Sequence, residues 1–590
     1  MTPSVSPSTT AFNDEQKEFL SRLLEGMPLV PELVAPAAAR EPETLYGIAL
    51  EDLSKEERIK LERHGLDIWE TLAANADAGR FPQGDDIFRY KFHGLFYVAP
   101  AQNALMCRLR LPACEISAHQ LRGVADIAER FGGGYADITT RGNLQIREIP
   151  AHHAVDVLIA LAELGITSKG SGADNVRNIT ASPTSGFDPQ ELYDVRPLAK
   201  ALHHQILNSR ELYGLPRKFN VAFDSGGAIS VAADTNDIAF IATRVAEGNG
   251  LPAGIYFRVQ LGGITGHRTF AQDCGLLLTP EQTVPTAVAM ISVFIENADR
   301  TNRKKARLKY LLEKWGIDRF LQEAIARLPF IPSTLALEAC APRPPVHRGA
   351  HVGLHPQRQH GLSWIGVGIP VGRMTADQMR GLSQIAGRRG SGDIRLTVYQ
   401  NAIIPNVASR DVEAARAEIM ALGFHVESSL VSGGFVACTG SRGCRYAAAD
   451  TKGDARTIAA YLQDRVTLDL PLNVHVTGCA HSCAQHYCGD IGLIATRVQL
   501  ADGATVDGYN VMIGGGMDHE QGLARELVKN VPATEVPMLL EQVLNSYLQR
   551  RLPGETFIAY ARRHQIPQLL ETLTDCTAPE PALPAMEAPQ

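Results

Sequence analysis

Four cysteines in the second half of the chain have the type and spacing of metal ligands. They are Cys438, Cys444, Cys479 and Cys483, in the segments ACTGSRGC and TGCAHSCAQHYC. The spacing is C-x5-C, then thirty-four residues, then C-x3-C. Iron in a cubane cluster prefers four soft thiolate ligands, and glycines beside the cysteines let backbone N–H groups approach the sulfurs. The set therefore predicts a [4Fe-4S] cluster.

Structural zinc is the alternative metal for these cysteines. Zinc pairs usually have two to four intervening residues, so the five-residue gap between Cys438 and Cys444 favours iron. Burial as small apolar residues is disfavoured because four cysteines occur in two pairs. Spacing alone leaves zinc open. Cys488 lies outside the motif, and we expect a buried structural thiol there.

Size and composition limit the class of protein. A chain of 590 residues exceeds one hydrophobic core, so we expect several domains. Hydrophobic and charged fractions of 45% and 21% are typical of a folded soluble protein, and a net charge of -7 argues against nucleic-acid binding. We find no membrane-spanning run and no secretory pattern, and the cysteine content indicates a cytoplasmic, reducing location.

Two internal repeats predict the elements that must position the cysteines. Residues 110–146 resemble residues 368–404 at a constant offset of 258, and each copy has the pattern strand, helix, strand, helix. The segment NDIAFIATRV (236–245) nearly duplicates GDIGLIATRV (489–498). We therefore expect an α+β fold with pseudo-twofold symmetry, and a ligand site in the cleft between the halves.

Local signals refine this organisation. Ser117 and Thr375 stand where helix N-caps would, at equivalent positions of the first repeat. The segment LNVHV alternates as a strand, so Cys479 and Cys483 should follow a strand end.

Basic residues occur in two patterned segments. In MCRLRLP, alternation puts Arg108 and Arg110 on one strand face, which by itself predicts a polar surface towards water. The run TNRKKARLKYLLEKWG (301–316) has apolar residues at helical spacing, which predicts a helix with either a solvated basic face or an anion-binding one.

Taken together, these motifs resemble the sirohaem-dependent nitrite and sulfite reductases, specifically the ferredoxin-dependent nitrite reductase branch, from about residue 45 to about 570. The resemblance implies a duplicated ferredoxin-like half-domain plus a larger α/β sirohaem and iron–sulfur domain, with the cofactors in the cleft between the halves. The expected divisions are an N-terminal extension (1–45), a first ferredoxin-like repeat (46–165), a first sirohaem-binding domain (166–340), a second ferredoxin-like repeat (350–425), an iron–sulfur/sirohaem domain (430–570) and a disordered tail (571–590).

The resemblance also assigns roles to basic residues. Three segments resemble family segments that contain catalytic, positively charged residues: MCRLRLP, SGADNVRN and LPRKFN. The resemblance implies that Arg108, Arg177 and Lys218 are catalytic. ITTRGNLQIR matches a sirohaem-contacting segment, which puts Arg141 beside the macrocycle. The family usually has glutamine after this arginine, whereas this chain has Gly142.

Ligands and substrate follow from the same resemblance. In the family the four cysteines hold the [4Fe-4S] cluster and the last one bridges to the sirohaem iron, which implies that Cys483 binds both cofactors. The lysine motif carries Asn220 where sulfite reductases usually have a second lysine, and we count Asn220 among the cofactor-site residues. We expect reduction of nitrite to ammonium, with sulfite reduction as the alternative, and one cation fewer suits a monoanion.

Partners and rival classes complete the expectations. No G-x-G-x-x-G motif follows a strand, so electrons should come from a separate protein such as ferredoxin. We expect a monomer that binds neither nucleic acid nor membrane. The rival classes are a non-catalytic electron carrier, a zinc-stabilised interaction module and a precorrin-3 ring-contracting enzyme. The complete double repeat disfavours the last of these.

Overall fold

The computed structural model describes residues 44–346, 351–427 and 431–574, and the chain divides after Asp52 into two units. In the described part of the first unit, β1 (Thr44–Leu45) pairs antiparallel with β2 (Ile48–Ala49), and the short 3-10 helix η1 (Leu50–Asp52) follows. All elements below belong to the second unit. Most of the expected extension and tail lies outside the described residues.

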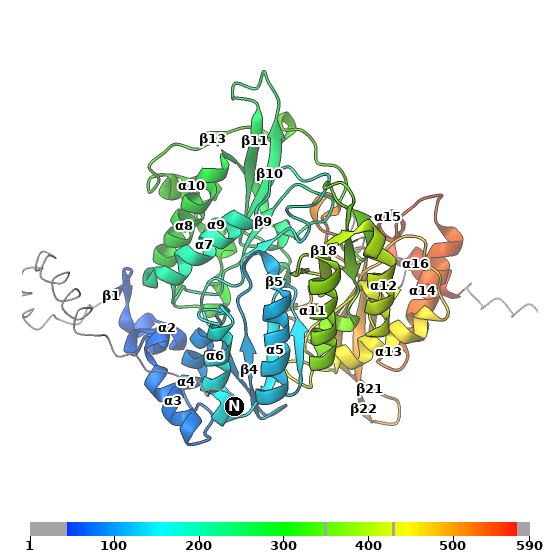
Figure 1. Ribbon diagram of the computed structural model, residues 1–590, viewed down its shortest axis with the longest axis horizontal. Helices are drawn as coiled ribbons and strands as arrows, with labels where there is room; N and C mark the ends of the chain where they lie inside the picture. The colour runs from blue at the N-terminus through cyan, green and yellow to red at the C-terminus, as the bar shows by residue number, and fades with distance from the viewer. Residues whose placement is uncertain (1–43, 347–350, 428–430, 575–590) are drawn as a thin grey trace, which may run out of the picture. The chain divides into compact units, whose positions relative to one another are not determined.

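Two five-stranded antiparallel sheets correspond to the two copies of the first repeat (Figure 1). One has the order β16 (Arg373–Thr375), β6 (Tyr135–Ile138), β7 (Leu144–Ile149), β4 (Ala104–Arg108), β3 (Leu95–Val98). The other has the order β14 (Gly353–Pro356), β15 (Leu362–Val367), β18 (Ala402–Ala408), β17 (Asp393–Leu396), β5 (Glu115–Ser117). Their helices are α5 (Ala118–Phe131), α6 (Ala154–Glu163), α11 (Ala376–Arg389) and α12 (Val412–Ala421). Each copy therefore has two strands between its helices, where the sequence pattern predicted one.

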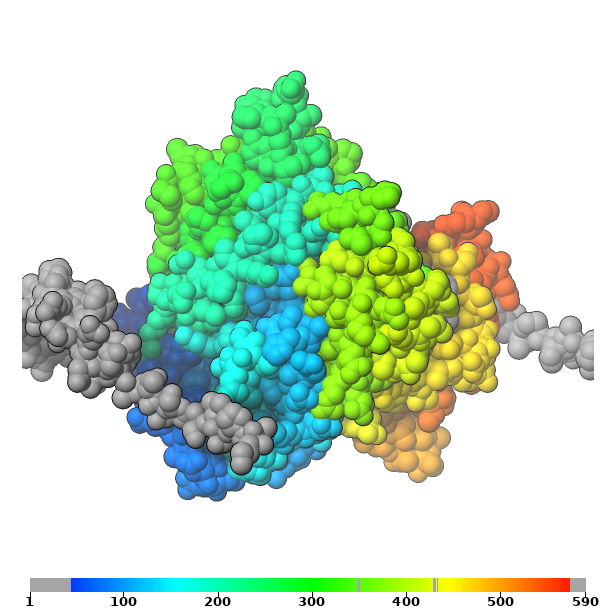
Figure 2. Space-filling view, viewed as in Figure 1, coloured from blue at the N-terminus to red at the C-terminus, as the bar shows by residue number. Residues whose placement is uncertain are grey.

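The two copies exchange a strand. The strand β5 belongs to the first copy but pairs with β17 of the second, whereas β16 of the second pairs with β6 of the first. Helices α5 and α11 pack against each other, and both sheets share one apolar core. Figure 2 shows the two copies side by side, the first in blue and cyan and the second in yellow-green. The copies thus form one interlocked structure about a pseudo-twofold axis.

The predicted N-caps are confirmed at both equivalent helices. The Ser117 hydroxyl accepts from the Gln120 N–H at 3.1 Å, and the Gln120 side chain accepts from the Ser117 N–H at 3.0 Å. Thr375 and Gln378 form the same reciprocal pair. Such capping boxes satisfy two backbone donors that a helix start leaves unpaired.

The second repeat forms two further sheets of matching topology. In each, three parallel strands precede antiparallel ones, so the second duplication is confirmed. The first has the order β13 (Ser333–Thr334), β12 (Gln272–Leu278), β11 (Gly254–Leu261), β10 (Ile238–Val245), β9 (Val221–Asp224), β8 (Thr180–Ala181). The second has the order β19 (Phe435–Ala437), β20 (Val474–Thr477), β21 (Ile491–Gln499), β22 (Thr505–Ile513), β23 (Arg525–Pro532).

Helices cover these sheets and the start of the unit. Those beside the first sheet are α7 (Arg196–Asn208), α8 (Pro280–Asn297), α9 (Leu308–Trp315) and α10 (Ile317–Ile325). Those beside the second are α13 (Thr451–Gln463), α14 (Val536–Arg550), α15 (Phe557–Arg563) and α16 (Ile566–Thr574). The unit opens with α2 (Lys55–Glu62), α3 (Trp69–Asp77) and α4 (Asp86–Arg89). Within the described ranges, every helix is too short or too polar to cross a bilayer.

Parallel pairing brings the cysteine segments together. The strand β19 ends at Ala437, one residue before Cys438, and β20 ends at Thr477, two residues before Cys479. Because β19 and β20 are parallel neighbours, their carboxyl ends meet at the same sheet edge. The predicted position of Cys479 and Cys483 after a strand end is confirmed.

Candidate active site

A cavity of about 740 Å³ is lined by residues from both halves of the duplicated unit. Asp137 is the only acidic residue in its described lining, against nine basic ones. The basic residues are Arg108, Arg141, Arg177, Arg217, Lys218, Arg303, Lys304, Arg307 and Lys452. A positive cavity in a chain of net charge -7 is suited to a large anionic ligand.

Arg108 and Arg177 converge on one carbonyl at the cavity wall. Arg108 Nη1 donates to the Ser171 carbonyl at 3.4 Å, and Arg177 Nη1 donates to the same oxygen at 3.1 Å. The Arg108 guanidinium also stacks 4.5 Å from the Phe96 ring centroid, and Arg177 Nη2 donates to the Ala173 carbonyl at 2.7 Å. Burial, followed by the charge of the other arginine, lowers the pKa of Arg177. The two side chains are therefore held together although both are cations.

Lys218 lies in the same cavity, and its pKa is well below that of an ordinary lysine. Burial, followed by the nearby charge of Arg307, lowers the pKa of Lys218 to about 7. A lysine with this pKa exchanges a proton near neutrality, which an ordinary lysine does not. Two residues on, the buried Asn220 donates its backbone N–H to Asp237 Oδ2 at 2.9 Å and lines the cavity.

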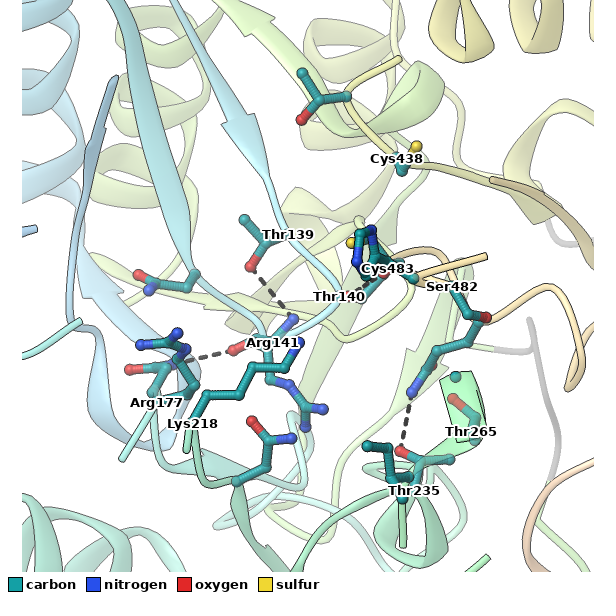
Figure 3. A pocket seen from close by; sticks show the side chains of 18 of the residues that line it. Thr139, Thr140, Arg141, Arg177, Lys218, Thr235, Thr265, Cys438, Ser482 and Cys483 are labelled. Carbon is teal, nitrogen blue, oxygen red and sulfur yellow. Dashed lines mark hydrogen bonds between the residues drawn. The ribbon is translucent and has the colours of Figure 1, made fainter. Parts of the chain in front are cut away.

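Arg141 follows β6 and reaches into the cavity beside Lys218 (Figure 3). Its backbone N–H donates to Thr139 Oγ1 at 3.3 Å, and its Nη1 donates to Asn236 Oδ1. Burial lowers the pKa of Arg141 to about 10, a value at which the guanidinium remains charged at neutral pH. The hydrogen bonds fix the direction of this charge.

Two buried carboxylates pair with arginines that line the cavity. Asp174, which is fully buried, accepts two hydrogen bonds from Arg303 at 2.5 and 2.8 Å. Asp237 accepts from Arg307 Nη2 at 2.7 Å. Paired carboxylates of this kind hold arginines in one geometry and offset the cost of burying them. The sequence showed the basic run 301–316 but not these partners.

The four predicted cysteines gather beside the cavity. Cys438 and Cys483 line it, whereas Cys444 and Cys479 do not. The Gly478 N–H donates to Cys438 Sγ at 3.2 Å, as expected of a glycine next to a ligand sulfur. Burial raises the pKa of Cys483 to about 11; Lys218 acts in the opposite direction, and the other three cysteines contribute to the rise because they lie close by. Such thiols lose their protons when a metal binds.

The arrangement of these sulfurs bears on the choice between iron and zinc. Across residues 44–346, 351–427 and 431–574, no three His, Cys, Asp or Glu side chains surround a single point as the ligands of one ion do. In a cubane cluster each cysteine binds a different iron, so its ligands lie further apart than those of one zinc ion. The four thiols lie close enough to act on one another's pKa, and four cysteines are the donor set that a cubane cluster takes.

The cavity also fits a sirohaem. Its volume lies within the range of cofactor pockets, and its basic wall complements a macrocycle that carries eight carboxylates. Figure 3 shows Arg141, Arg177 and Lys218 on one side and Cys483 on the loop opposite. The basic residues would hold the carboxylates of a sirohaem, and Cys483 would hold its iron.

Two predictions from single segments need correction. Arg110 does not face water: it is 2% exposed, and its Nη1 donates to the Val176 carbonyl at 2.9 Å. Arg108 faces the cavity and not the solvent, because β4 is an inner strand whose polar face is covered by other parts of the chain. The predicted helix covers only the second part of the run 301–316: α9 is Leu308–Trp315, whereas Arg303–Lys305 form a 3-10 helix, and Leu308 and Leu311 are buried as expected.

Several cavity residues were absent from the sequence prediction. Lys452 follows the cysteine segment and Gln400 belongs to the second ferredoxin-like copy, yet both line the cavity. Tyr310 and His267 lie at its wall and share a hydrogen bond of 2.7 Å. The only sequence signal for Gln400 is the internal repeat, in which Gln400 is equivalent to Gly142, the residue after Arg141.

Comparison with known proteins identifies the family. The Nitrite and sulphite reductase 4Fe-4S domain matches residues 172–331 and 434–571, and the Nitrite/Sulfite reductase ferredoxin-like half domain matches residues 99–164 and 355–422. The chain belongs to the nitrite and sulphite reductase family. The family carries a [4Fe-4S] cluster and a sirohaem, so the cofactors and fold class expected from the sequence are confirmed.

Individual relatives cover nearly the same length. Ferredoxin–nitrite reductase of Synechococcus elongatus is 34% identical over 87% of this chain and 98% of its own. The chloroplastic ferredoxin–nitrite reductase of Zea mays is 31% identical over 83% of this chain and 89% of its own. The solved structure of the Mycobacterium tuberculosis NirA protein superposes with a TM-score of 0.80 at 25% identity, over 88% of this chain and 97% of its own.

Proposed function

We propose that this chain reduces nitrite to ammonium with electrons from reduced ferredoxin. The reaction takes up six electrons and eight protons. The observation that carries the proposal is the convergence of Arg108, Arg177 and Lys218 on a cavity whose other side presents Cys483. An anion site that also contains a proton donor, next to a predicted redox ligand, suits an anionic substrate that must gain both electrons and protons.

The cofactors would be held by residues from both halves. Cys438, Cys444, Cys479 and Cys483 would bind the [4Fe-4S] cluster, and Cys483 would also bind the sirohaem iron. Arg141, beside Asn220, would face the sirohaem carboxylates. When bound, the cluster and the sirohaem would pass on the electrons that ferredoxin donates and would provide the iron centre at which the substrate is reduced.

The chain's own residues would bind the substrate and supply protons. Arg108 and Arg177 would present paired N–H donors to the oxygens of an anion. Both donate to the Ser171 carbonyl, which holds the two guanidiniums next to each other. Lys218, whose pKa is lowered to about 7, donates a proton as the oxygens leave as water. Because its pKa is close to neutral pH, the neutral amine can take up another proton from solvent after each transfer.

Nitrite is favoured over sulfite by both the site and the relatives. Asn220 contributes no charge where a second lysine would stand. The matched proteins of Synechococcus elongatus, Zea mays and Haloferax mediterranei are named as ferredoxin-dependent nitrite reductases. Steady-state assays with both anions and a reduced dye test the choice: a kcat/KM for sulfite at or above that for nitrite would contradict it.

The surface beside the cysteines suits an acidic electron donor. On the Cys444 loop, the Arg442 side chain is 79% exposed, and Arg445 stacks 4.8 Å from the centroid of the exposed Tyr446 ring. Ferredoxin-dependent rates should therefore fall as ionic strength rises, because exposed charge pairs are screened. Rates that do not depend on salt would argue against ferredoxin at this surface.

We also infer a cytoplasmic monomer. Residues from both halves of the chain line the cavity, as expected if a single copy is active. Size-exclusion chromatography with light scattering should give a mass close to the 63.9 kDa of the chain plus its cofactors, and a dimer would contradict the inference.

One spectrum tests the central claim. The purified protein should show a sirohaem Soret band that shifts when nitrite is added, together with cluster absorbance. A non-catalytic electron carrier would lack the Soret band, and a zinc protein would be colourless.

A further inference from the structure

One glutamine from the second ferredoxin-like copy joins two strand ends that lead into the cavity. Gln400 lies in the turn between β17 and β18 and is 4% exposed. Its Nε2 donates to the Ile138 carbonyl at 3.1 Å and to the Ala437 carbonyl at 2.9 Å, and its Oε1 accepts from the Ala437 N–H at 2.8 Å. Both amide N–H groups and one acceptor site of the oxygen are therefore engaged with backbone.

The two strand ends are followed by the predicted cofactor segments. Ile138 is the last residue of β6 and precedes the Thr139–Arg141 segment, and Ala437 is the last residue of β19 and precedes Cys438. A movement of Ala437 would displace Cys438, whose sulfur accepts from the Gly478 N–H at 3.2 Å. Hydrogen bonds to ligand sulfurs help to set the reduction potential of an iron–sulfur cluster.

The backbone at Gln400 is strained, which indicates that its position matters. Its φ is +63°, in the left-handed region that a residue with a side chain seldom adopts. Gly372 gives the room that this conformation needs, since a Cβ there would lie 2.8 Å from Gln400 Cβ. Strain of this kind persists only where surrounding contacts over-determine the conformation.

The pseudo-twofold axis provides an internal comparison. The equivalent of Gln400 is Gly142, and the equivalent of Gly372 is Cys114. The second ferredoxin-like copy, which precedes the cysteine segment, therefore has this glutamine, and the first copy has a glycine in its place. Nothing in the fold of the repeat itself requires a glutamine at this position, because the first copy folds without one.

We propose that Gln400 is a positioning residue that holds Cys438 and the Thr139–Arg141 segment in one geometry, and thereby tunes the cluster and its coupling to the neighbouring cofactor. The inference rests on the cofactor set of the proposed function but not on the substrate. Its test needs no nitrite, so a failure of the proposed nitrite chemistry would be seen separately in the turnover assays.

The test is a redox titration of three purified holoenzyme variants, followed by visible and electron paramagnetic resonance spectra. Gln400→Met keeps the Cβ and the chain length but removes all three hydrogen bonds. Gln400→Glu keeps an acceptor for the Ala437 N–H and loses the amide donor. The matched control is Gln378→Met, because Gln378 also bonds only to backbone, at Thr375 and Leu422, within the same copy and outside the cavity.

We expect both Gln400 variants to shift the cluster midpoint potential, or to lose the cluster, with the larger effect in Gln400→Met. The Gln378→Met control should lower the melting temperature while the potential and the spectrum stay at wild-type values. A wild-type potential in Gln400→Met would overturn the proposal. So would a control that shifts or loses the cluster as strongly, since the effect would then be general destabilisation.

Discussion

Gly142 should tolerate a glutamine only if Cys114 is also replaced. A Cβ at Gly142 would lie 2.3 Å from Cys114 Sγ and 2.7 Å from Cys114 Cβ, both far closer than contact distance. The backbone there has φ +52°, so any side chain also adds left-handed strain. In the second copy the arrangement is reversed, because Gly372 leaves room for Gln400.

The magnitude follows from these two costs. Overpacking a tight core costs about 1–3 kcal/mol, and left-handed backbone at a residue other than glycine costs roughly 1–2 kcal/mol. Gly142→Gln should therefore lower the free energy of unfolding by about 2–5 kcal/mol, or the melting temperature by roughly 4–20 °C if the cooperative unit has 150–250 residues.

The double variant Cys114→Gly, Gly142→Gln should recover most of this loss. With the sulfur removed, the glutamine can donate to the Leu396 carbonyl, which is the equivalent of the Ile138 carbonyl that accepts from Gln400. We expect a coupling energy of about 1–3 kcal/mol between the two sites. Cys114→Gly alone should have a small effect, because glycine relieves the φ of +60° at that residue.

The assay is differential scanning calorimetry or dye-monitored melting of all four proteins with matched cofactor content. The reasoning would be refuted by a single Gly142→Gln variant that melts with the wild type. It would also be refuted by a double variant that is no more stable than the single one.

Three further predictions concern chemistry and pH. Because the pKa of Lys218 is lowered to about 7, nitrite turnover should fall as pH rises through this value, and Lys218→Met should reduce kcat by about 10²–10⁴-fold and remove that pH limb; an unchanged pH profile in the variant would assign the limb to another group. Burial and Asp518 raise the pKa of Asp234 to about 7, so the folded protein holds a proton that the unfolded chain releases near pH 4. The unfolding free energy should thus decrease between about pH 4 and 7, by up to about 4 kcal/mol, and melting curves of Asp234→Asn should lack this decrease. Cys483→Ala should lose sirohaem coupling and turnover together, and six-electron reduction by this variant would exclude the bridging role.

Much of the architecture was readable from local patterns. The N-caps at Ser117 and Thr375 and the strand before Cys479 depend on residues close in sequence, and the repeat at an offset of 258 residues is visible as similar local patterns in two segments; the structure confirms all of them. The cysteine set and the family motifs were equally local, because the chemistry of a ligand or a base requires particular residue types at particular spacings. These local features are sufficient to indicate the family and its cofactors.

Tertiary structure alone decided how distant segments meet. Sequence periodicity assigned Arg110 to a water-facing surface, yet chain elements far from it in sequence bury it. The exchange of β5 and β16 between the copies could not be inferred either, because backbone pairing leaves no pattern in side-chain types. For the same reason the carboxylates behind the basic wall and the backbone contacts of Gln400 emerged only from the fold. Local sequence specifies which groups are present, whereas packing between remote segments decides which of them face one another.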